Sequence, residues 1–497
     1  MSSGIIFRSS VKCAFYLCNS SNMKMQFTES HFFRFSTGGR TNIYGLSVFE
    51  TKMESGGLPI NSGFPSNIIK SLPPYEDFMK RKNERDDDDN AKIYKHLFVS
   101  SFYGITCFIA ATGHWSTVEL PLDKEIGEII SIHAFPSSRS DLVLSLTTVQ
   151  SSPKSADEEP QHQFTLRVYS LGDNTSIMSM EEAIFRTVAK HQSISLSFVP
   201  MQLYHAKIKI NGESKVGLLL SGTDGGIHLY LENNNKDDPI RWIEESVRPY
   251  FPSLLSLLDS NSNISILEIQ EINDLKIIAA GCQNGILFIS ILKLDIETNE
   301  YVQLEEPYSV ALFSPITSIT IFSSFTSEVD PSDIHLLVTC AVEQAIVYCN
   351  IIKNLLSYPI YLIECTKYDS VLCSHVLDVD WDGRNEIIIG TYGREMLIFK
   401  QDINEDPNST ISFKLIHQQS FIHPIYGIKG IYLNQDGINE LIVATQYGVH
   451  ILQPNLDKAK EVLVKRLKNL ERLRQEYHHL ESIVVNNNNN NNNNNVN

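Results

Sequence analysis

Five residues in the second half of the chain have the types and spacing of a metal-binding loop. Asp378, Asp380 and Asp382 alternate along the sequence, Gly383 follows them directly, and Glu386 comes three residues later. Alternate carboxylates around a glycine turn can converge on a hard cation, and calcium prefers oxygen ligands of this kind. The spacing therefore predicts a calcium site formed by Asp378, Asp380, Asp382 and Glu386. The alternative is that these side chains cap the turn by accepting hydrogen bonds from backbone N–H groups.

A second loop, 54 residues further on, repeats part of this pattern. Asn434, Asp436, Gly437 and Glu440 keep the spacing, whereas Tyr432 stands in place of the first acid. The first loop resembles the calcium loop of integrin-type FG-GAP repeats, in which the last ligand is normally Asp rather than Glu. Because the second loop keeps few oxygen ligands, we expect calcium at the first loop in preference to the second.

Motifs for catalysis are missing from the sequence. It contains no nucleophile elbow, phosphate-binding loop, zinc-protease motif or protein-kinase signature. Gly222–Gly226 is rich in glycine, but it connects two predicted strands and does not precede a helix, so we interpret it as a hairpin turn. We therefore expect a protein that is not an enzyme, with no catalytic residue and no cofactor apart from calcium at the acidic loop.

The elements that carry these loops recur along the chain. In each copy an apolar run ends at a small residue, a short polar turn follows, and apolar residues then alternate with polar ones, as in Leu218–Tyr230 and Glu440–Leu452. The small residues that mark the copies are Ser100, Ser145, Gly222, Gly281, Ala341, Gly390 and Ala444. A hairpin repeated at a period of roughly 50 residues is typical of a propeller, whose blades cover one another in a closed ring. The sequence thus predicts an all-β fold, a seven-bladed β-propeller.

The composition changes on either side of this array and once within it. We expect a disordered extension over residues 1–30, a propeller over residues 31–454, and a disordered insertion inside it at about residues 52–92. An amphipathic α-helix is predicted over residues 455–482, and a disordered Asn-rich tail over residues 483–497.

The predicted C-terminal helix has an apolar stripe that nothing in its own sequence covers. The residues that form the stripe are Leu456, Leu463, Leu467, Leu470, Leu473, Tyr477 and Leu480. No Gly or Pro interrupts it, and Asn455 or Asp457 would cap its first turn. Such a stripe must be covered by the propeller or by another protein. We predict that Leu463, Leu470 and Leu473 bind a partner, and docking on the last blade is the alternative.

The overall composition excludes several classes of protein. A formal net charge of −17 argues against a nucleic-acid surface. No apolar run reaches the ~18 residues that a membrane helix needs, so we expect a soluble protein with no direct membrane insertion. The eight cysteines lack zinc-ligand spacing and several lie in apolar runs, which favours buried, reduced thiols in an intracellular protein.

Five segments of the chain resemble the kaptin family of KICSTOR complex subunits. They are Phe33–Leu46, Phe198–Ala206, Leu219–Asn233, Tyr368–Leu397 and Asp436–Gln453, and the resemblance extends in register over about residues 30–480. The resemblance implies a β-propeller subunit that pairs with a second FG-GAP propeller and a very large scaffold protein. The N-terminal extension, the insertion and the asparagine tract lie outside the matched segments.

The same resemblance implies a function and a location. A complex of this kind places the GATOR complex on the lysosome and restrains the TOR kinase when amino acids are scarce. The expected protein is therefore a cytoplasmic scaffold, peripheral at the lysosomal membrane. The alternative that the family allows is a structural protein associated with actin filaments, at the actin-rich cell cortex.

Overall fold

The computed structural model describes most of the chain between Phe27 and Asn493. The described residues are 27–35, 39–53, 92–123, 125–137, 142–152, 161–170, 179–189, 191–210, 213–233, 241–295, 297–298, 300–326, 333–402 and 411–493. Most of the predicted disordered extension over residues 1–30 and of the predicted insertion at about residues 52–92 lies outside them. Of the predicted disordered tail over residues 483–497, only residues 494–497 lie outside.

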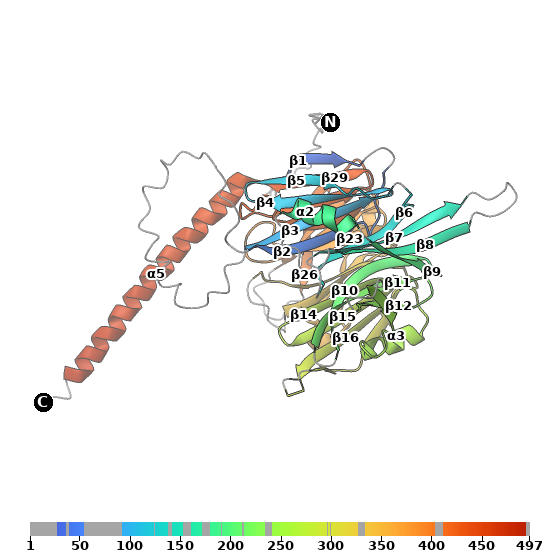
Figure 1. Cartoon of the computed structure of the whole chain (residues 1–497). Coiled ribbons are helices and arrows are strands. Elements are labelled where there is room, and N and C mark those ends of the chain that lie inside the picture. Colours follow the sequence, from blue (N-terminus) through green and yellow to red (C-terminus); the bar gives the residue numbers. More distant parts are fainter. Residues whose placement is uncertain are drawn as a thin grey trace.

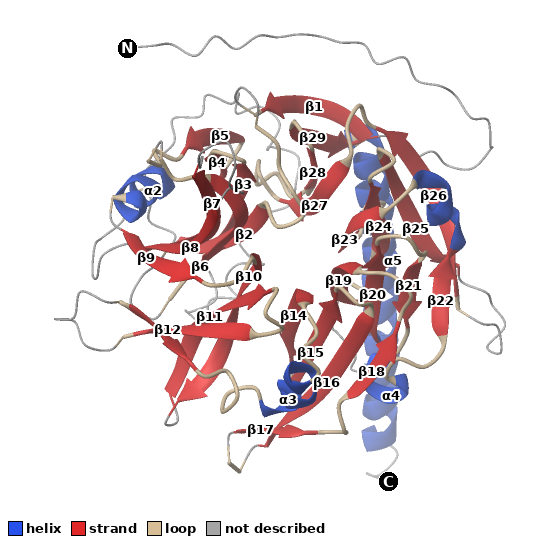
Figure 2. Cartoon of the chain, turned by 90° about the vertical axis from the view of Figure 1, so that its right-hand side faces the viewer, coloured by secondary structure: helices blue, strands red, loops and turns tan. Residues whose placement is uncertain are grey.

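The described strands form seven antiparallel sheets arranged as blades around a common axis (Figure 2). The strands of the first three blades are β2 Leu46–Met53, β3 Lys92–Ser101, β4 Gly104–Ala111 and β5 His114–Glu119; β6 Glu128–Phe135, β7 Val143–Ser152, β8 Gln161–Ser170 and β9 His191–Leu196; and β10 Pro200–Ile210, β11 Glu213–Gly222, β12 Ile227–Glu232 and β13 Trp242–Glu245. In each blade the first strand in this order lies nearest the axis, and the following strands lie progressively further out (Figure 2).

The next three blades follow the same order, and the fourth carries one additional outer strand. Their strands are β14 Ile264–Ile272, β15 Leu275–Cys282, β16 Ile286–Asp295, β17 Glu300–Gln303 and β18 Tyr308–Ala311; β19 Ile316–Ser323, β20 Ile334–Cys340, β21 Ala345–Tyr348 and β22 Pro359–Leu362; and β23 Val371–Leu377, β24 Glu386–Thr391, β25 Glu395–Asp402 and β26 Ser412–Ser420. The seventh blade is β27 Ile425–Ile431, β28 Glu440–Thr445, β29 Gly448–Pro454 and β1 Phe27–Arg34. The seven-bladed all-β prediction is therefore confirmed.

The helices among the described residues lie outside the blades. They are α2 Met180–Val188, α3 Leu255–Asp259, α4 Ile351–Asn354, the 3-10 helices η2 Pro252–Leu254 and η4 Ile363–Tyr368, and the long C-terminal helix α5 Leu456–Asn493. The predicted end of this helix at residue 482 was wrong, because α5 continues into the asparagine tract. Asparagine is a weak helix former, but unlike proline it keeps the backbone N–H that propagates the helix.

The ring is closed by a strand from the opposite end of the sequence. Strand β1 pairs with β29, from Phe27 opposite Pro454 to Arg34 opposite Gly448. The predicted propeller boundary at residue 31 is therefore too late, since the closing strand begins at Phe27. Pairing the two ends of the chain removes the open edge that the last blade would otherwise expose.

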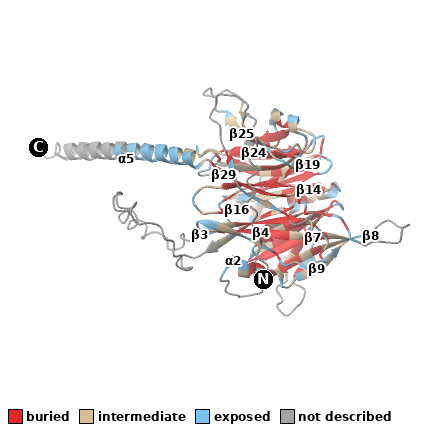
Figure 3. Ribbon diagram, turned by 90° about the horizontal axis from the view of Figure 1, so that it is seen from above, coloured by how far each residue is buried: buried red, intermediate tan, exposed pale blue. Residues whose placement is uncertain are grey.

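Hydrophobic clusters fill the spaces between neighbouring blades. Seven such clusters are present among the described residues, one at each interface between adjacent blades. Strands β15, β20, β24 and β28 are buried along their whole length, which Figure 3 shows as a red interior. Each second strand is thus covered on both faces, as the stacked arrangement requires.

The small marker residues allow this close stacking. A Cβ atom on Gly281 would lie 2.5 Å from a methyl group of Ile316 in the next blade, and one on Gly390 would lie 2.6 Å from Ile425. Six of the markers lie at or next to the end of a second strand, but Ser145 lies near the start of β7. The long β7–β8 hairpin carries its turn much further along the chain, which accounts for the irregular spacing there.

The two phenylalanines of β1 offer a test of ring closure. Phe27 is 6% exposed and packs in the cluster between the sixth and seventh blades, whereas Phe32 on the same strand is 45% exposed. We expect Phe27→Ala to lower the free energy of unfolding by about 3 kcal/mol, as large-to-small core changes do. The control Phe32→Ala should cost less than about 1 kcal/mol. Urea unfolding of both variants measures the difference, and equal losses would argue against a closing role for the buried face of β1.

Candidate functional site

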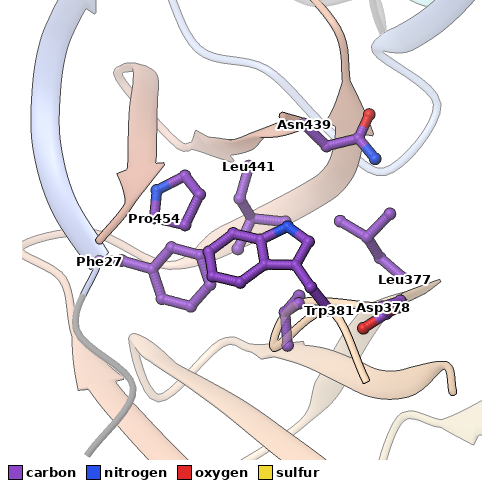
Figure 4. Close-up of a pocket in the computed structure, with 8 residues that line it drawn as sticks. Phe27, Leu377, Asp378, Trp381, Asn439, Leu441 and Pro454 are labelled. Carbon is purple, nitrogen blue, oxygen red and sulfur yellow. The ribbon is translucent and has the colours of Figure 1, made fainter. Parts of the chain in front are cut away.

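The acidic loop and the start of α5 lie side by side at one end of the last two blades. Figure 4 shows Trp381 of the loop close to Phe27 of β1 and Pro454 of β29 around a small pocket, which Leu377 and Leu441 also line. Helix α5 begins directly after Pro454. The closing strand, the predicted metal loop and the predicted docking helix therefore meet at one place.

The aspartates of the loop accept hydrogen bonds from its own backbone. Asp378 Oδ2 accepts from the N–H of Gly383 at 2.9 Å, and Asp382 Oδ1 accepts from the N–H of Arg384 at 2.9 Å. Asp380 Oδ1 accepts a longer hydrogen bond, 3.3 Å, from the N–H of Asp382. Gly383 adopts a φ of 90°, which only glycine takes without strain. The capping role that was the alternative to calcium is present in the structure.

A lysine of the neighbouring strand supplies positive charge to the same loop. Lys400 of β25 places its Nζ atom 2.6 Å from Asp380 Oδ2, 2.6 Å from Asp382 Oδ2 and 2.8 Å from Glu386 Oε1. Glu386 is fully buried, and its other oxygen accepts from the N–H of Val379 at 2.9 Å. A buried carboxylate requires a partner of this kind, because removing its charge from water without one costs several kcal/mol per ion.

The titration of these groups reflects burial and mutual charge. Burial raises the pKa of Glu386 to about 7, and the hydrogen bond from Lys400 opposes this increase. Burial by itself would lower the pKa of Lys400, but the hydrogen bonds to Asp380, Asp382 and Glu386 raise it above its ordinary value. Burial also raises the pKa of Asp378. The lysine therefore stays charged at neutral pH.

The four predicted calcium ligands lie together, but their arrangement does not fit calcium as it stands. Oxygen atoms of Asp378, Asp380 and Asp382 come within 4.8 Å of one another. Calcium contacts its oxygen ligands at about 2.3–2.6 Å, so it would have to occupy the position of the Lys400 ammonium group. Binding requires this side chain to move away, and calcium binding at this loop stays a prediction.

In the second loop the buried glutamate is paired with a side-chain amide instead of a lysine. Glu440 is 2% exposed, and its Oε2 atom accepts from the N–H of Leu433 at 2.9 Å. Its Oε1 atom accepts from Asn434 Nδ2 at 2.6 Å. Gln435 and Gly437 repeat the positive φ angles of Trp381 and Gly383. Pro454 stands where the first loop has its lysine, 14 residues after the buried glutamate.

Two buried histidines hold the equivalent position in other blades, and sequence reasoning missed them. His96 of β3 and His335 of β20 lie five residues before the end of the second strand, as Glu386 and Glu440 do. His96 Nδ1 accepts from the N–H of Ala110 at 3.1 Å, and His335 Nδ1 accepts from the N–H of Asn350 at 3.0 Å. A polar residue recurring at this point in an apolar run is the sequence signal that identifies them.

His335 belongs to a serine–histidine–aspartate group that does not have catalytic geometry. Ser324 Oγ lies 2.7 Å and Asp333 Oδ1 lies 3.1 Å from the same ring atom, Nε2. A nucleophilic triad needs the serine and the aspartate on opposite ring nitrogens. Here the other nitrogen accepts a backbone N–H, so the group stabilises the blade.

Helix α5 projects from the propeller and exposes its apolar residues (Figures 1 and 3). Asn455, one of the two predicted caps, caps the helix, since its Oδ1 atom accepts from the N–H groups of Asp457 at 3.0 Å and Lys458 at 3.2 Å. Leu463 is 57% and Leu470 is 61% exposed. The side chain of Leu473, the third predicted contact, lies outside the described set. The described stripe is therefore not covered by the last blade.

No described helix is both long and apolar enough to cross a membrane.

Comparison with known proteins identifies the family of the chain and solved structures to which it is similar. The family model described as KICSTOR complex protein kaptin matches residues 120–464. KICSTOR complex protein kaptin of Mus musculus is 30% identical over 357 residues, which cover 70% of this chain and 77% of the mouse protein. Two crystal structures of BBS1N in complex with ARL6DN, one soaked with mercury and one with lead, are 13% identical to this chain. Each alignment covers 72% of this chain and 87% of the other chain, with a TM-score of 0.39.

The role of Lys400 can be tested with calcium. We expect the melting temperature of the unaltered chain to be the same with chelator and with added calcium. Lys400→Ala should lose roughly 3–5 kcal/mol in chelator, because it leaves the buried carboxylate of Glu386 unpaired, and calcium should restore part of that loss. Lys414→Ala, which changes an exposed lysine opposite Lys400, is the control. Calcium-dependent melting of the unaltered chain would instead support a metal site.

The same pair predicts a pH dependence. The pKa of Glu386 is raised in the folded state, so its contribution to stability is present below the ordinary value of 4.5 and is lost as the pH rises through about 7. Lys400→Met removes the group that opposes this shift. The stability difference between the unaltered chain and the variant should therefore grow between about pH 6 and about pH 8 in urea unfolding. The double variant Lys400→Met with Glu386→Gln should abolish that growth, and a constant difference in the single variant would refute the coupling.

Proposed function

The chain belongs to the kaptin family, and we propose that it is a non-enzymatic scaffold subunit of a KICSTOR-like complex. The mouse relative is named as a KICSTOR complex protein. The matched residues 120–464 include blades two to six, strands β27 to β29 of the seventh blade and the first turns of α5. The proposed partners are the other subunits of such a complex, including a second FG-GAP propeller and a large scaffold protein.

The finer role that we propose concerns nutrient signalling. A KICSTOR-like complex containing this subunit would recruit the GATOR complex to lysosomes and restrain TOR complex signalling when amino acids are scarce. The protein would act in the cytoplasm and reach the lysosomal surface through its partners. Family membership supports this role.

The observation that carries a scaffold function is the exposed apolar stripe of α5. Leu456, Leu463, Leu467 and Leu470 are each more than half exposed along a helix that projects from the propeller. In proteins most helical stability comes from packing of an amphipathic face, so a helix whose apolar face is exposed would gain stability from a partner surface. The stripe therefore supports α5 as the element by which the subunit joins its complex.

Two features of the propeller support the absence of enzymatic activity. The group of Ser324, Asp333 and His335 lacks the arrangement of a nucleophilic triad. The carboxylates Asp380 and Asp382 are each ion-paired with Lys400 and hydrogen-bonded to the loop backbone, so both already serve to hold the loop.

The leucine stripe gives the test of the proposed function. Replacing Leu463, Leu470 and Leu473 with Asp should abolish co-purification of KICSTOR-type subunits, because charges would enter the apolar contact. The melting temperature of the propeller should stay unchanged, since Leu463 and Leu470 do not contribute to its core. The control variant Lys465→Asp with Lys468→Asp, which changes the opposite side of the helix, should retain the subunits. Mass spectrometry of the purified complexes provides the measurement.

Two results would count against this proposal. Undiminished recovery of the subunits with the leucine variant would exclude α5 as the docking element. Recovery of actin and its cross-linking proteins in place of KICSTOR-type subunits would favour the cytoskeletal alternative.

A further inference from the structure

We propose that the partner segment of α5 is an acidic amphipathic helix, which pairs with the leucine stripe and sets carboxylates against Lys460 and Arg474. This inference rests on the proposed function, because it takes α5 as the docking element. It adds the chemistry of the partner, which no comparison with known proteins supplies.

The shape of the stripe fits another helix. Leu456, Leu463 and Leu470 recur every seven residues, and Leu467 stands between the last two. With 3.6 residues per turn these four side chains fall in one narrow line along the helix. A line of leucines with a period of seven is the seam along which two helices pack, each side chain entering a space between residues of the other helix. All four leucines are exposed in the structure.

Two basic residues interrupt this line. Lys460 and Arg474 follow Leu456 and Leu470 by four residues, so they lie on the same side of the helix as the leucines. Both are exposed. A charged residue within the seam of a helix pair costs stability unless the partner supplies the opposite charge, and it thereby selects the partner and the register. The seam thus calls for acidic residues at two defined positions.

The charge of the whole helix points the same way. Residues 456–475 carry seven lysines and arginines against three acids, whereas the full chain has a formal net charge of −17. The basic residues of this segment are Lys458, Lys460, Lys465, Arg466, Lys468, Arg472 and Arg474. An acidic helix would be attracted to α5 along its length, and complementary charge speeds association and suppresses wrong partners.

A second copy of the chain fits this seam poorly. In a parallel pair, Lys460 of one copy would face Lys460 of the other, and Arg474 would face Arg474. In either orientation two strongly basic helices would lie together, and like charges across such a contact are destabilising. The net positive charge of this segment therefore favours a different, acidic chain over self-association.

An anionic membrane surface also fits less well than a helix. A helix lying on a membrane buries its apolar face and keeps its basic residues at the border or on the polar side. Here Lys460 and Arg474 lie within the apolar line, where they would be pressed toward the acyl chains. Lys465 and Lys468 lie on the opposite side and would face water.

The test uses the full chain and two synthetic helical peptides. Both peptides carry leucine every seven residues, and they differ only in having Glu or Lys at the positions that face Lys460 and Arg474. We expect the Glu peptide to bind at least about tenfold more tightly in fluorescence anisotropy, and added salt to weaken it. The variant Lys460→Glu with Arg474→Glu should reverse the preference. The matched control Lys465→Glu with Lys468→Glu, with the same charge change outside the seam, should keep it.

Several outcomes would overturn the proposal. These are equal binding of the two peptides or of neither, self-association of the chain by light scattering, and tighter binding to vesicles of anionic lipid than to the Glu peptide. The chain also has an acidic run of its own, Asp86–Asp89. If the peptides bind only after these four residues are replaced by Asn, this run and not another protein occupies the leucine stripe, and the proposal is wrong.

The failure of this inference is distinguishable from failure of the proposed function. If the leucine variant loses its subunits but the Lys460→Glu and Arg474→Glu variant shows no change in peptide preference, α5 docks by apolar contact alone and the acidic helix is wrong. If the leucine variant keeps its subunits, the docking role itself fails.

Discussion

The second strands of the blades are buried on both faces, and the rest of the structure depends on how the ring covers them. Strands β15, β20, β24 and β28 have no exposed residue, so each needs an apolar neighbour on either side. A row of such blades would leave two uncovered faces, and closing the row removes both. Hydrogen bonding of β1 to β29 completes the last blade, which lets its hydrophobic cluster form against the first blade. Closure and core formation are therefore one cooperative requirement.

The buried polar residue in the second strand shows how this constraint determines the chemistry of the loops. Glu386 and Glu440 each fix a loop by accepting a backbone N–H, and each has a second oxygen that must also find a partner. One receives the ammonium group of Lys400 and the other the amide of Asn434. At the equivalent position, His96 and His335 each accept a backbone N–H with a ring nitrogen. A pattern of acids that resembles a calcium loop can thus arise from loop capping and charge pairing.

The fold could be predicted from the sequence because its hairpin unit repeats. Contacts between side chains on neighbouring strands could not be predicted. Small residues such as Gly281 and Gly390 mark the blades because a side chain there would strike the next blade. The start of the closing strand was predicted four residues too late, because its partner β29 lies at the far end of the chain and local sequence does not show the pairing. The clustering of three aspartates followed from their spacing. Lys400 was missed, since only the register of β24 against β25 brings it to Glu386, and no motif records that register.

The position of α5 links the proposed docking helix to ring closure. The helix begins after Pro454, the residue of β29 that lies opposite Phe27 of the closing strand, and Trp381 of the acidic loop lies beside both (Figure 4). Arg466 of α5 lies near Gly383 of the same loop. Because Asn455 caps the helix immediately beyond the strand, no flexible linker separates the two elements. A force applied to α5 would therefore act directly on β29. The pairing of β29 with β1 and the capping of the acidic loop together determine how rigidly the proposed docking helix is held.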